Sequence, residues 1–286
     1  MGDLLNWKRK FKKEVESKVT YPRVKIDELT LKDIAGICDH TFLDRSEGFK
    51  ARAEPGKNPI ALRRQAFVKF LDEVVTLPNK PYAVCVRPED VNFAKNYLHL
   101  GHRREAGNVA IASVVGFPDG SWYSTEHKLI ETKLALQDYA TEIDFVLNYD
   151  MLKTGDLGYV RQENRDIVGL AERYGAKTKM ILEVSELNLE QVRLACLLAE
   201  EAGVDFVKTS TGYSASGATV EALETMRQNF PRGIKISGGV KTLDDAKKFL
   251  RAAYGVIEGS GAEVDLDPEN IRIGESGLLK KVEGSY

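Results

Sequence analysis

Cysteine is scarce in this sequence, and no two cysteines form a CxxC pair. The 286 residues contain Cys38, Cys85 and Cys196. An odd and sparse set excludes a disulfide-stapled scaffold and indicates reduced intracellular thiols. The first residues are charged and lack the apolar core of a signal peptide, and no run of about 18 apolar residues is long enough to cross a bilayer. We therefore expect a cytoplasmic protein with no membrane partner.

An excess of charge of one sign is also missing. Lysine and arginine total 41 against 43 aspartates and glutamates, which gives a formal net charge of −2. A nearly neutral chain has no global electrostatic attraction for nucleic acid, so we expect no nucleic-acid partner. Any site for an anion must therefore be local. The hydrophobic fraction of 43% excludes intrinsic disorder and lets a chain of this length bury a large core.

Metal and nucleotide motifs are absent from the sequence. The four histidines show no ligand spacing, no HExxH or GxSxG motif occurs, and no GxGxxG turn opens the first strand–helix unit. We therefore expect neither a metal nor an organic cofactor.

Short apolar runs that alternate with amphipathic stretches dominate the sequence from residue 36 onward. Eight runs have the length and β-branched content of strands buried on both faces. They are Ile37–Leu43, Tyr82–Val86, Val109–Val115, Ile143–Leu147, Thr178–Val184, Val204–Lys208, Gly233–Ile236 and Ile271–Gly274. Helical periodicity occupies residues 61–75, 89–98, 126–139, 158–174, 189–202, 220–228 and 244–253.

This alternation predicts an α/β fold, specifically a (β/α)8 TIM barrel over residues 36–286 with an N-terminal helical extension over residues 1–35. An open doubly wound sheet is the alternative, because periodicity alone does not distinguish the two. Residues 44–59 form a long polar loop after the first strand, at the catalytic face of such a barrel. It is either a substrate lid or a disordered insertion.

Charged residues inside strands are the most informative feature, because burying an unpaired charge is costly. Lys208 ends the run VDFVK and Lys235 lies within GIKISGG, one strand–helix unit later. A barrel brings both to neighbouring strand ends, where repulsion and desolvation lower a lysine pKa. A neutral lysine is the nucleophile of Schiff-base chemistry.

Asp144, Asp39 and Lys179 are further charges within the predicted strands. Asp144 could balance the lysines and move protons. The alternative for all of these charges is an internal salt-bridge cluster that fixes the barrel register. Cys85 also has two interpretations: it either lines the substrate pocket or is a small packing residue.

Small residues follow the late strands as TSTG (209–212), SGG (237–239) and GESG (274–277). Glycine lets backbone N–H groups approach an anion, and barrel enzymes often bind phosphate after strands seven and eight. We therefore expect a phosphate site there, with Thr211 also contacting substrate.

Taken together, these motifs resemble the deoxyribose-phosphate aldolase family of class I aldolases over residues 37–279. The strongest matches are VDFVKTSTG (204–212), IKISGGVKT (234–242) and TEIDFVLNYDMLKTGD (141–156), with weaker ones at DHTFL (39–43), AVCVRPEDV (83–91), ASVVGFPDG (112–120) and RIGESG (272–277).

The resemblance implies roles for individual residues. Lys208 would form the Schiff base, Lys235 would perturb its pKa, and Asp144 would relay protons through water. The positions that would line the substrate pocket are Asp39, Thr41, Cys85 and Lys179; those in phosphate-binding segments are Gly212, Gly238, Gly239, Gly274 and Ser276.

The chain departs from the family pattern at three positions. Ser237 replaces the usual alanine, Gly277 stands where a second serine is common, and Arg87 replaces a neutral or aromatic residue. The chain ends in Tyr286, as some members do, and that tyrosine would either reach the active site or be mobile.

The resemblance implies reversible cleavage of 2-deoxy-D-ribose 5-phosphate to D-glyceraldehyde 3-phosphate and acetaldehyde. Its partners would be a sugar phosphate and aldehydes. One alternative is another phosphate-binding barrel aldolase that acts on a ketose or a keto-acid. The other is a catalytically silent barrel that binds a sugar phosphate. The sequence leaves the oligomeric state open, a homo-oligomer included.

Overall fold

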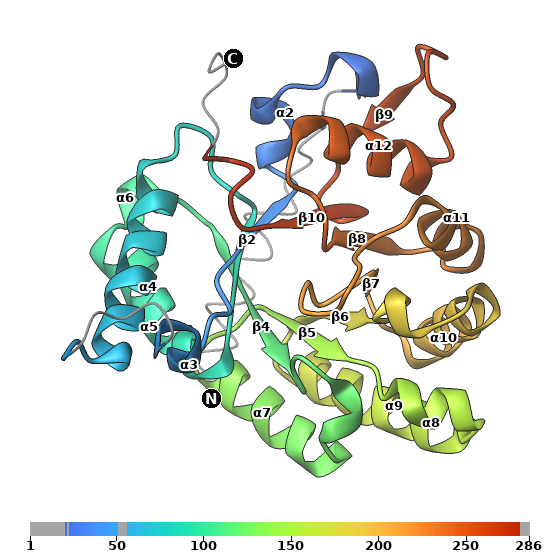
Figure 1. Cartoon of the computed structure of the whole chain (residues 1–286), viewed down its shortest axis with the longest axis horizontal. Coiled ribbons are helices and arrows are strands. Elements are labelled where there is room, and N and C mark those ends of the chain that lie inside the picture. The colour runs from blue at the N-terminus through green and yellow to red at the C-terminus, as the bar shows by residue number, and fades with distance from the viewer. Residues whose placement is uncertain (1–20, 22, 51–55, 281–286) are drawn as a thin grey trace.

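A closed barrel of parallel strands forms the centre of the molecule (Figure 1). The structure, a computed structural model, describes residue 21, residues 23–50 and residues 56–280. The strands follow one another around the barrel in the order β10, β2, β3, β4, β5, β6, β7, β8. Because every strand has a neighbour on both sides, the barrel prediction is confirmed and the open sheet is excluded.

The eight barrel strands coincide with the eight predicted apolar runs to within a few residues. Strands such as β3 are buried at every position, which explains why they lack the alternation of a half-exposed sheet. The strands are β2 (Cys38–Thr41), β3 (Ala83–Val86), β4 (Ala110–Val115), β5 (Glu142–Val146), β6 (Lys177–Ile181), β7 (Phe206–Lys208), β8 (Gly233–Ser237) and β10 (Ile271–Glu275).

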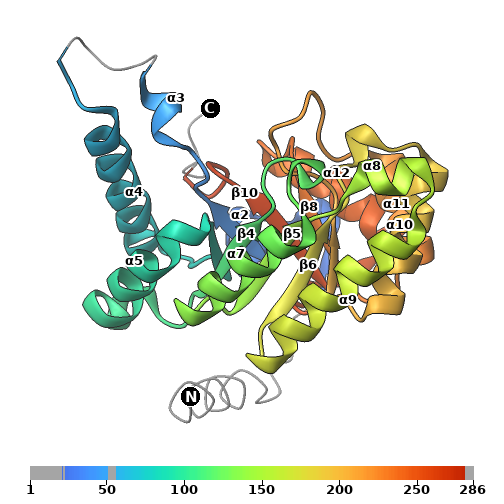
Figure 2. The same ribbon diagram turned by 90° about the horizontal axis from the view of Figure 1, so that it is seen from below.

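Helices cover the outside of the strands, as Figure 2 shows for α7 and α9. The main ones are α4 (Pro59–Thr76), α5 (Val91–Lys95), α7 (Thr125–Gln137), α9 (Leu157–Arg173), α10 (Leu189–Ala202), α11 (Val220–Asn229) and α12 (Leu243–Tyr254). Side-chain caps explain several starts: Asn58 accepts the N–H of Ile60 in α4, and Thr242 forms a capping box with Asp245 in α12. Gly203 and Gly255 end α10 and α12 in the left-handed conformation.

The structure differs from the predicted elements in three segments. The polar loop after the first strand contains a short helix, α3 (Ser46–Lys50), while residues 51–55 lie outside the described part. The single helix expected over residues 89–98 divides into η2 (Pro88–Asp90), α5, the π-helical turn η3 (Asn96–Gly101) and α6 (Arg103–Ala106). An additional helix, α8 (Tyr149–Thr154), precedes α9 because Gly155 ends it in the left-handed conformation.

The segment before the barrel is only partly described. Residues 1–20 of the predicted N-terminal extension lie outside the described residues, so that domain boundary stays a prediction. The described part consists of β1 (Arg23–Lys25), η1 (Ile26–Glu28) and α2 (Leu31–Ala35). β1 pairs antiparallel with β9 (Glu263–Asp265), which ties this segment to the chain just before β10. Tyr286 also lies outside the described residues.

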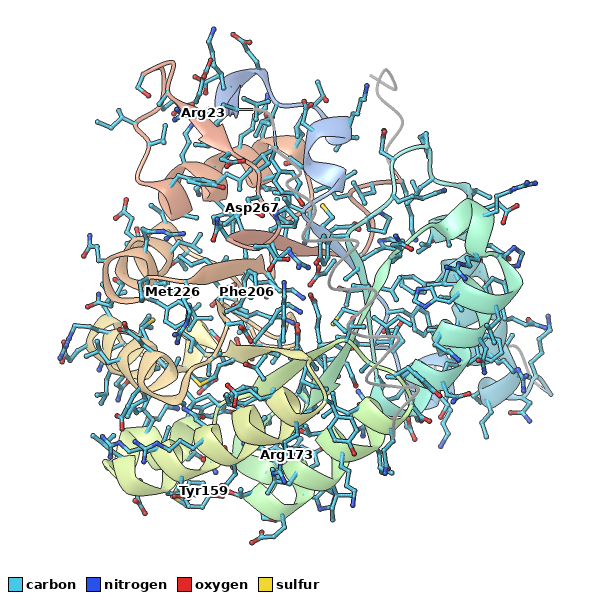
Figure 3. The ribbon with its side chains drawn as sticks, turned by 180° about the vertical axis from the view of Figure 1, so that it is seen from behind. Arg23, Tyr159, Arg173, Phe206, Met226 and Asp267 are labelled. Carbon is cyan, nitrogen blue, oxygen red and sulfur yellow. The ribbon has the colours of Figure 1, made fainter. Side chains whose placement is uncertain are left out.

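Two apolar cores lie on the two sides of the barrel wall. The larger one fills the space between strands and helices; Figure 3 shows Met226 of this layer on α11 and Phe206 near the barrel axis. The smaller one lies inside the barrel and includes Cys85, Val114 and Val146. The interior also holds buried charged side chains such as Lys179, Lys235 and Arg272. Within the described residues, no helix combines the length and apolarity needed to cross a membrane.

Candidate active site

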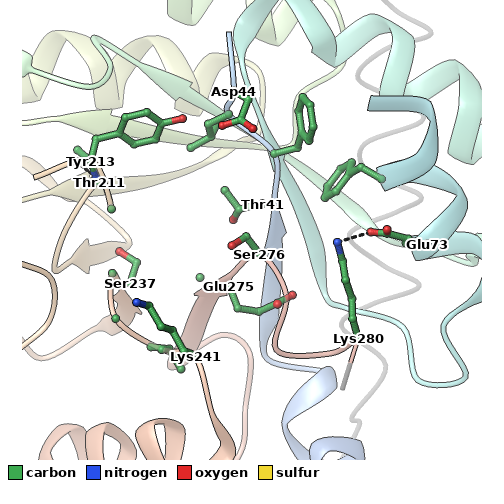
Figure 4. Close-up of a pocket in the computed structure, with 18 of the residues that line it drawn as sticks. Thr41, Asp44, Glu73, Thr211, Tyr213, Ser237, Lys241, Glu275, Ser276 and Lys280 are labelled. Atoms are coloured by element: carbon green, nitrogen blue, oxygen red, sulfur yellow. Dashed lines mark hydrogen bonds and ion pairs between the residues drawn. The ribbon is translucent and has the colours of Figure 1, made fainter. Parts of the chain in front are cut away.

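A cavity of about 680 Å³ opens at the carboxyl ends of the strands. Figure 4 shows its walls: the segments after β2, β7, β8 and β10, faced by helix α4. Eight of the predicted site residues line it, namely Thr41, Lys208, Thr211, Gly212, Gly238, Gly239, Gly274 and Ser276. The other five, Asp39, Cys85, Asp144, Lys179 and Lys235, are fully buried in the barrel beneath it.

Strand register brings the two predicted lysines together. Lys208 of β7 and Lys235 of β8 are direct partners in the parallel ladder. Both ammonium groups contact one carboxylate oxygen, Oδ2 of Asp144: the Nζ of Lys208 at 3.1 Å and the Nζ of Lys235 at 2.8 Å. Lys208 lines the cavity, whereas Lys235 and Asp144 lie beneath it. The accessible amine is therefore that of Lys208.

A buried ion network continues below these three residues. Asp39 accepts from Lys235 at 2.5 Å, and Lys179 donates to Asp144 at 2.7 Å and also to Glu142. Arg272 closes the network from β10, 2.9 Å from Asp39 and 3.1 Å from Glu142. The salt-bridge cluster considered from the sequence is thus present.

The network holds one more basic side chain than acidic ones. Its cations are Lys179, Lys208, Lys235 and Arg272, and its anions are Asp39, Glu142 and Asp144. An uncompensated charge is costly in a buried site, so the network balances when one cation loses its proton. Among the four cations, Lys208 is the one whose pKa is lowered, by burial first and by the neighbouring charge of Lys235 second.

The other members of the network keep their charges. Burial works to lower the pKa of Lys235, but the carboxylates of Asp144 and Asp39 outweigh it and raise the pKa. Burial likewise opposes ionisation of Asp144, yet Lys179, Lys235 and Lys208 hold its pKa well below the ordinary value. The sequence argument that repulsion lowers a lysine pKa therefore applies to Lys208 and not to Lys235.

Backbone N–H groups for which the described residues provide no acceptor lie in the cavity lining. Among the residues that the structure describes, none accepts the N–H of Gly212, Gly238, Gly239 or Ser276. All four line the cavity. Gly212 has φ +85°, which an L side chain rarely adopts, and a Cβ on Gly274 would lie only 3.3 Å from Cε of Lys235. Such clustered donors suit a phosphate.

Hydroxyl groups join the segments after β7 and β8. Thr209 donates to the carbonyl oxygen of Ser237 at 2.8 Å and accepts the Ser237 N–H at 2.9 Å. The Ser237 hydroxyl in turn donates to the carbonyl oxygen of Ser210 and accepts its N–H at 3.3 Å. An alanine at position 237 could not make these last two bonds, so Ser237 adds a link between the segments after β7 and β8.

Comparison with known proteins agrees with this geometry. The model of the DeoC/LacD family aldolases matches residues 57–263, which is most of the chain. The chain belongs to the DeoC/LacD family of aldolases.

Individual relatives of this aldolase support the assignment. The deoxyribose-phosphate aldolase of Thermococcus kodakarensis is 40% identical over 78% of this chain and 90% of its own length. That of Thermococcus gammatolerans is 38% identical over 88% of this chain and 96% of its own length. A solved deoxyribose-phosphate aldolase from Aeropyrum pernix, described as a tetramer, has a TM-score of 0.66 at 26% identity, covering 89% of this chain and 93% of its own.

Several residues of the aldolase site were not singled out in the sequence. Glu142 lies two residues before Asp144 on the same strand, so strand alternation could have placed both carboxylates inside the barrel. Arg272 likewise precedes Gly274 by two residues. Glu183, which binds Thr211, lies four residues after Lys179 within the predicted run Thr178–Val184, so the same alternation could have found it. No such pattern points to Lys241 and Lys280, which line the cavity. These depend on loop conformation, which periodicity does not encode.

Cys85 marks the boundary between the charged and the apolar parts of the barrel interior. Its Sγ lies 3.9 Å from Oδ2 of Asp144, and it also belongs to the inner apolar core. Burial raises the pKa of its thiol, so the aldolase keeps this cysteine protonated at neutral pH.

Proposed function

We propose that this aldolase cleaves 2-deoxy-D-ribose 5-phosphate reversibly to D-glyceraldehyde 3-phosphate and acetaldehyde, through a Schiff base on Lys208. The observation that carries the proposal is the position of Lys208: it lines the cavity, its pKa is lowered, and the same cavity is lined by four N–H groups that find no acceptor among the described residues. The named activity of the two Thermococcus relatives supports the choice of substrate.

Schiff-base formation begins with the neutral amine. The Nζ of Lys208 adds to the C1 aldehyde of the open-chain sugar, and the resulting carbinolamine takes up a proton and loses water to leave an iminium ion. An ordinary lysine, with a pKa of about 10.4, is neutral in only a small fraction of molecules at pH 7. Burial and the charge of Lys235 increase that fraction for Lys208.

Cleavage breaks the C2–C3 bond. A proton leaves the C3 hydroxyl, C3 becomes the aldehyde of glyceraldehyde 3-phosphate, and the bonding electrons enter the iminium to form an enamine. The Asp144 carboxylate, 3.1 Å from the Nζ of Lys208, is placed to pass this proton through a water molecule to C2 of the enamine. Hydrolysis then frees acetaldehyde and Lys208. Because the iminium is the electron sink, the proposal includes no cofactor.

Substrate phosphate would occupy the side of the cavity formed by Gly212, Gly238, Gly239 and Ser276, with Gly274 leaving room for Lys235. Thr41 would form the facing wall. Asp39 and Lys179 would act from beneath the cavity by fixing Lys235 and Asp144. Cys85 would pack beside Asp144.

Borohydride trapping tests the nucleophile. Reduction in the presence of acetaldehyde is expected to leave a two-carbon adduct on Lys208, identified by peptide mass spectrometry. Lys208→Ala is the matched control: it should abolish turnover and the adduct, with a melting temperature close to that of the wild type. An adduct on Lys179 or Lys235, or full activity of Lys208→Ala, would overturn the proposal.

Product analysis separates the proposed substrate from the alternatives. Incubation with 2-deoxy-D-ribose 5-phosphate should yield acetaldehyde, whereas a ketose phosphate or a phosphorylated keto-acid should not be cleaved at a comparable rate. Thermal stabilisation by sugar phosphate without cleavage would instead indicate a silent binding barrel.

Two further expectations complete the proposal. A cytoplasmic location is supported by the absence, in the described residues, of any helix able to span a membrane. A homo-oligomer is supported by the tetramer described for the Aeropyrum pernix relative, and light scattering on the purified chain tests it.

A further inference from the structure

Glu183 is a buried carboxylate at the catalytic face with no part in the chemistry described above. It follows β6 and is 1% exposed. Its backbone has φ +54° and ψ +69°, in the left-handed region. Among the described residues, Tyr139 is the one other non-glycine with positive φ, and it lies before β5, at the opposite end of the barrel. Backbone strain of this kind persists where the surrounding structure imposes it, and it concentrates at functional sites.

The carboxylate of Glu183 is bound by neutral donors. Oε2 accepts the N–H of Thr211 at 3.0 Å and its hydroxyl at 2.5 Å, and Oε1 accepts the hydroxyl of Ser185 at 3.1 Å. Hydrogen bonds to a charged acceptor are about twice as strong as neutral ones. Both donors of Thr211 are therefore engaged, and Thr211 has none left for a ligand.

The contact fixes the conformation of the next residues. The hydroxyl that donates to Glu183 also accepts the N–H of Tyr213 at 3.1 Å. The residue between them is Gly212, with φ +85° and an N–H for which the described residues provide no acceptor. With Thr211 and Tyr213 both held, the Gly212 N–H remains as the free donor of this turn at the cavity wall.

We propose that Glu183 is a positioning residue that holds the Thr211–Tyr213 turn in the conformation that binds the substrate phosphate. The inference rests on the proposed function, because it requires phosphate to bind at Gly212. Glu183 would therefore act indirectly. Its carboxylate engages both donors of Thr211, and this orients the N–H of Gly212 toward the substrate phosphate.

Substitution by glycine gives the sharpest test. Glu183→Gly removes the carboxylate and at the same time relieves the left-handed backbone, so the fold is expected to persist. KM for 2-deoxy-D-ribose 5-phosphate should rise by about 10- to 100-fold, the scale of a small misplacement of a binding group. The value of kcat, and kcat/KM for unphosphorylated 2-deoxy-D-ribose, should change by less than about threefold, because the turn contacts only the phosphate.

Two control variants separate this role from a structural one. Glu183→Gln should restore KM to within about threefold, because its amide oxygen can accept both Thr211 bonds while its nitrogen donates to Ser185. Tyr139→Gly creates a glycine at the other left-handed position, remote from the cavity, and should leave KM for both substrates unchanged.

The outcomes distinguish failure of this inference from failure of the proposed function. If the wild type does not prefer the phosphorylated sugar, the phosphate site is wrong and the role of Glu183 is wrong with it. If the wild type prefers it and Glu183→Gly retains that preference, the inference alone fails. An equal loss with both sugars would also overturn it, because Glu183 would then support Lys208, whose carbonyl oxygen accepts the N–H of Leu182 at 2.8 Å.

Discussion

The two faces of the barrel wall bury opposite kinds of side chain, and β5 shows this within five residues. Ile143 and Phe145 point outward into the apolar layer beneath the helices. Glu142 and Asp144 point inward, where they contact Arg272 and Lys179. All four are buried. The sequence of this strand therefore alternates in chemistry although it does not alternate in exposure.

The two faces differ in how their members depend on one another. In the outer layer each apolar side chain contributes through the area that it removes from water, roughly independently of the rest. In the ion network every charge sets the protonation of its neighbours, and ion pairs of this kind contribute little net stability. The network is therefore better understood as the device that lowers the pKa of Lys208 than as a source of stability. Four predictions test this comparison.

The largest effect is expected for Lys235→Met. Without the charge of Lys235, Asp144 stabilises the protonated form of Lys208, so the pKa of Lys208 rises. Each unit of that rise reduces the fraction of neutral Lys208 amine at pH 7 about tenfold. We expect kcat/KM at pH 7 to fall by at least about tenfold. We also expect the pH profile of kcat/KM to shift toward alkaline pH. Lys179→Met, which removes another cation from Asp144, should shift the profile less. An unshifted profile would contradict this account of the network.

In the outer layer, Ile167→Ala on α9 should lower stability without affecting catalysis. Ile167 is fully buried, and truncation of such a residue costs about 2–5 kcal/mol. Denaturant unfolding measures that loss, and kcat should stay within about twofold of the wild type. A large change in kcat would show that the two faces of the wall are coupled.

Acid should destabilise the network before it affects the apolar layer. The pKa values of Asp39 and Asp144 are lowered in the folded protein despite burial, chiefly by Lys235 and Lys179. Their contribution to stability is complete above the unfolded aspartate pKa of about 3.9, and it is lost as the pH falls from there toward the folded values. Unfolding free energy measured from pH 6 to pH 2 should decline most steeply below about pH 4, and the decline should be shallower in Asp39→Asn.

The smallest effect is expected for Ser237→Ala. It removes the two hydrogen bonds that link the Ser237 hydroxyl to Ser210, which should cost about 1 kcal/mol. KM for the phosphorylated sugar should rise a few-fold with kcat unchanged. A much larger rise in KM would mean that the segments after β7 and β8 depend on this link for their conformation.

Much of the fold was predictable because buried parallel strands and amphipathic helices have distinct periods. All eight strands and the seven long helical segments were located, with a break at Asn96–Gly101 that periodicity did not show. Lys208, Lys235 and Asp144 stood out because a charge in an apolar run is anomalous wherever it occurs. Lys241 did not, because a charge in a polar loop is ordinary until the loop folds. Glu183 was overlooked although it lies within the predicted run Thr178–Val184, on the same face as Lys179.

The sequence by itself determined the eight strand–helix units and the charges within the strands, since these follow from local pattern and from the energy of burying charge. Only the tertiary structure decided that the sheet closes into a barrel and that the lowered lysine pKa belongs to Lys208. That outcome depends on register: Lys235 meets two carboxylates and Lys208 one, so the same side chain acquires a raised pKa on β8 and a lowered pKa on β7. Electrostatic interaction depends on distance in space, and that distance is set only when the barrel closes.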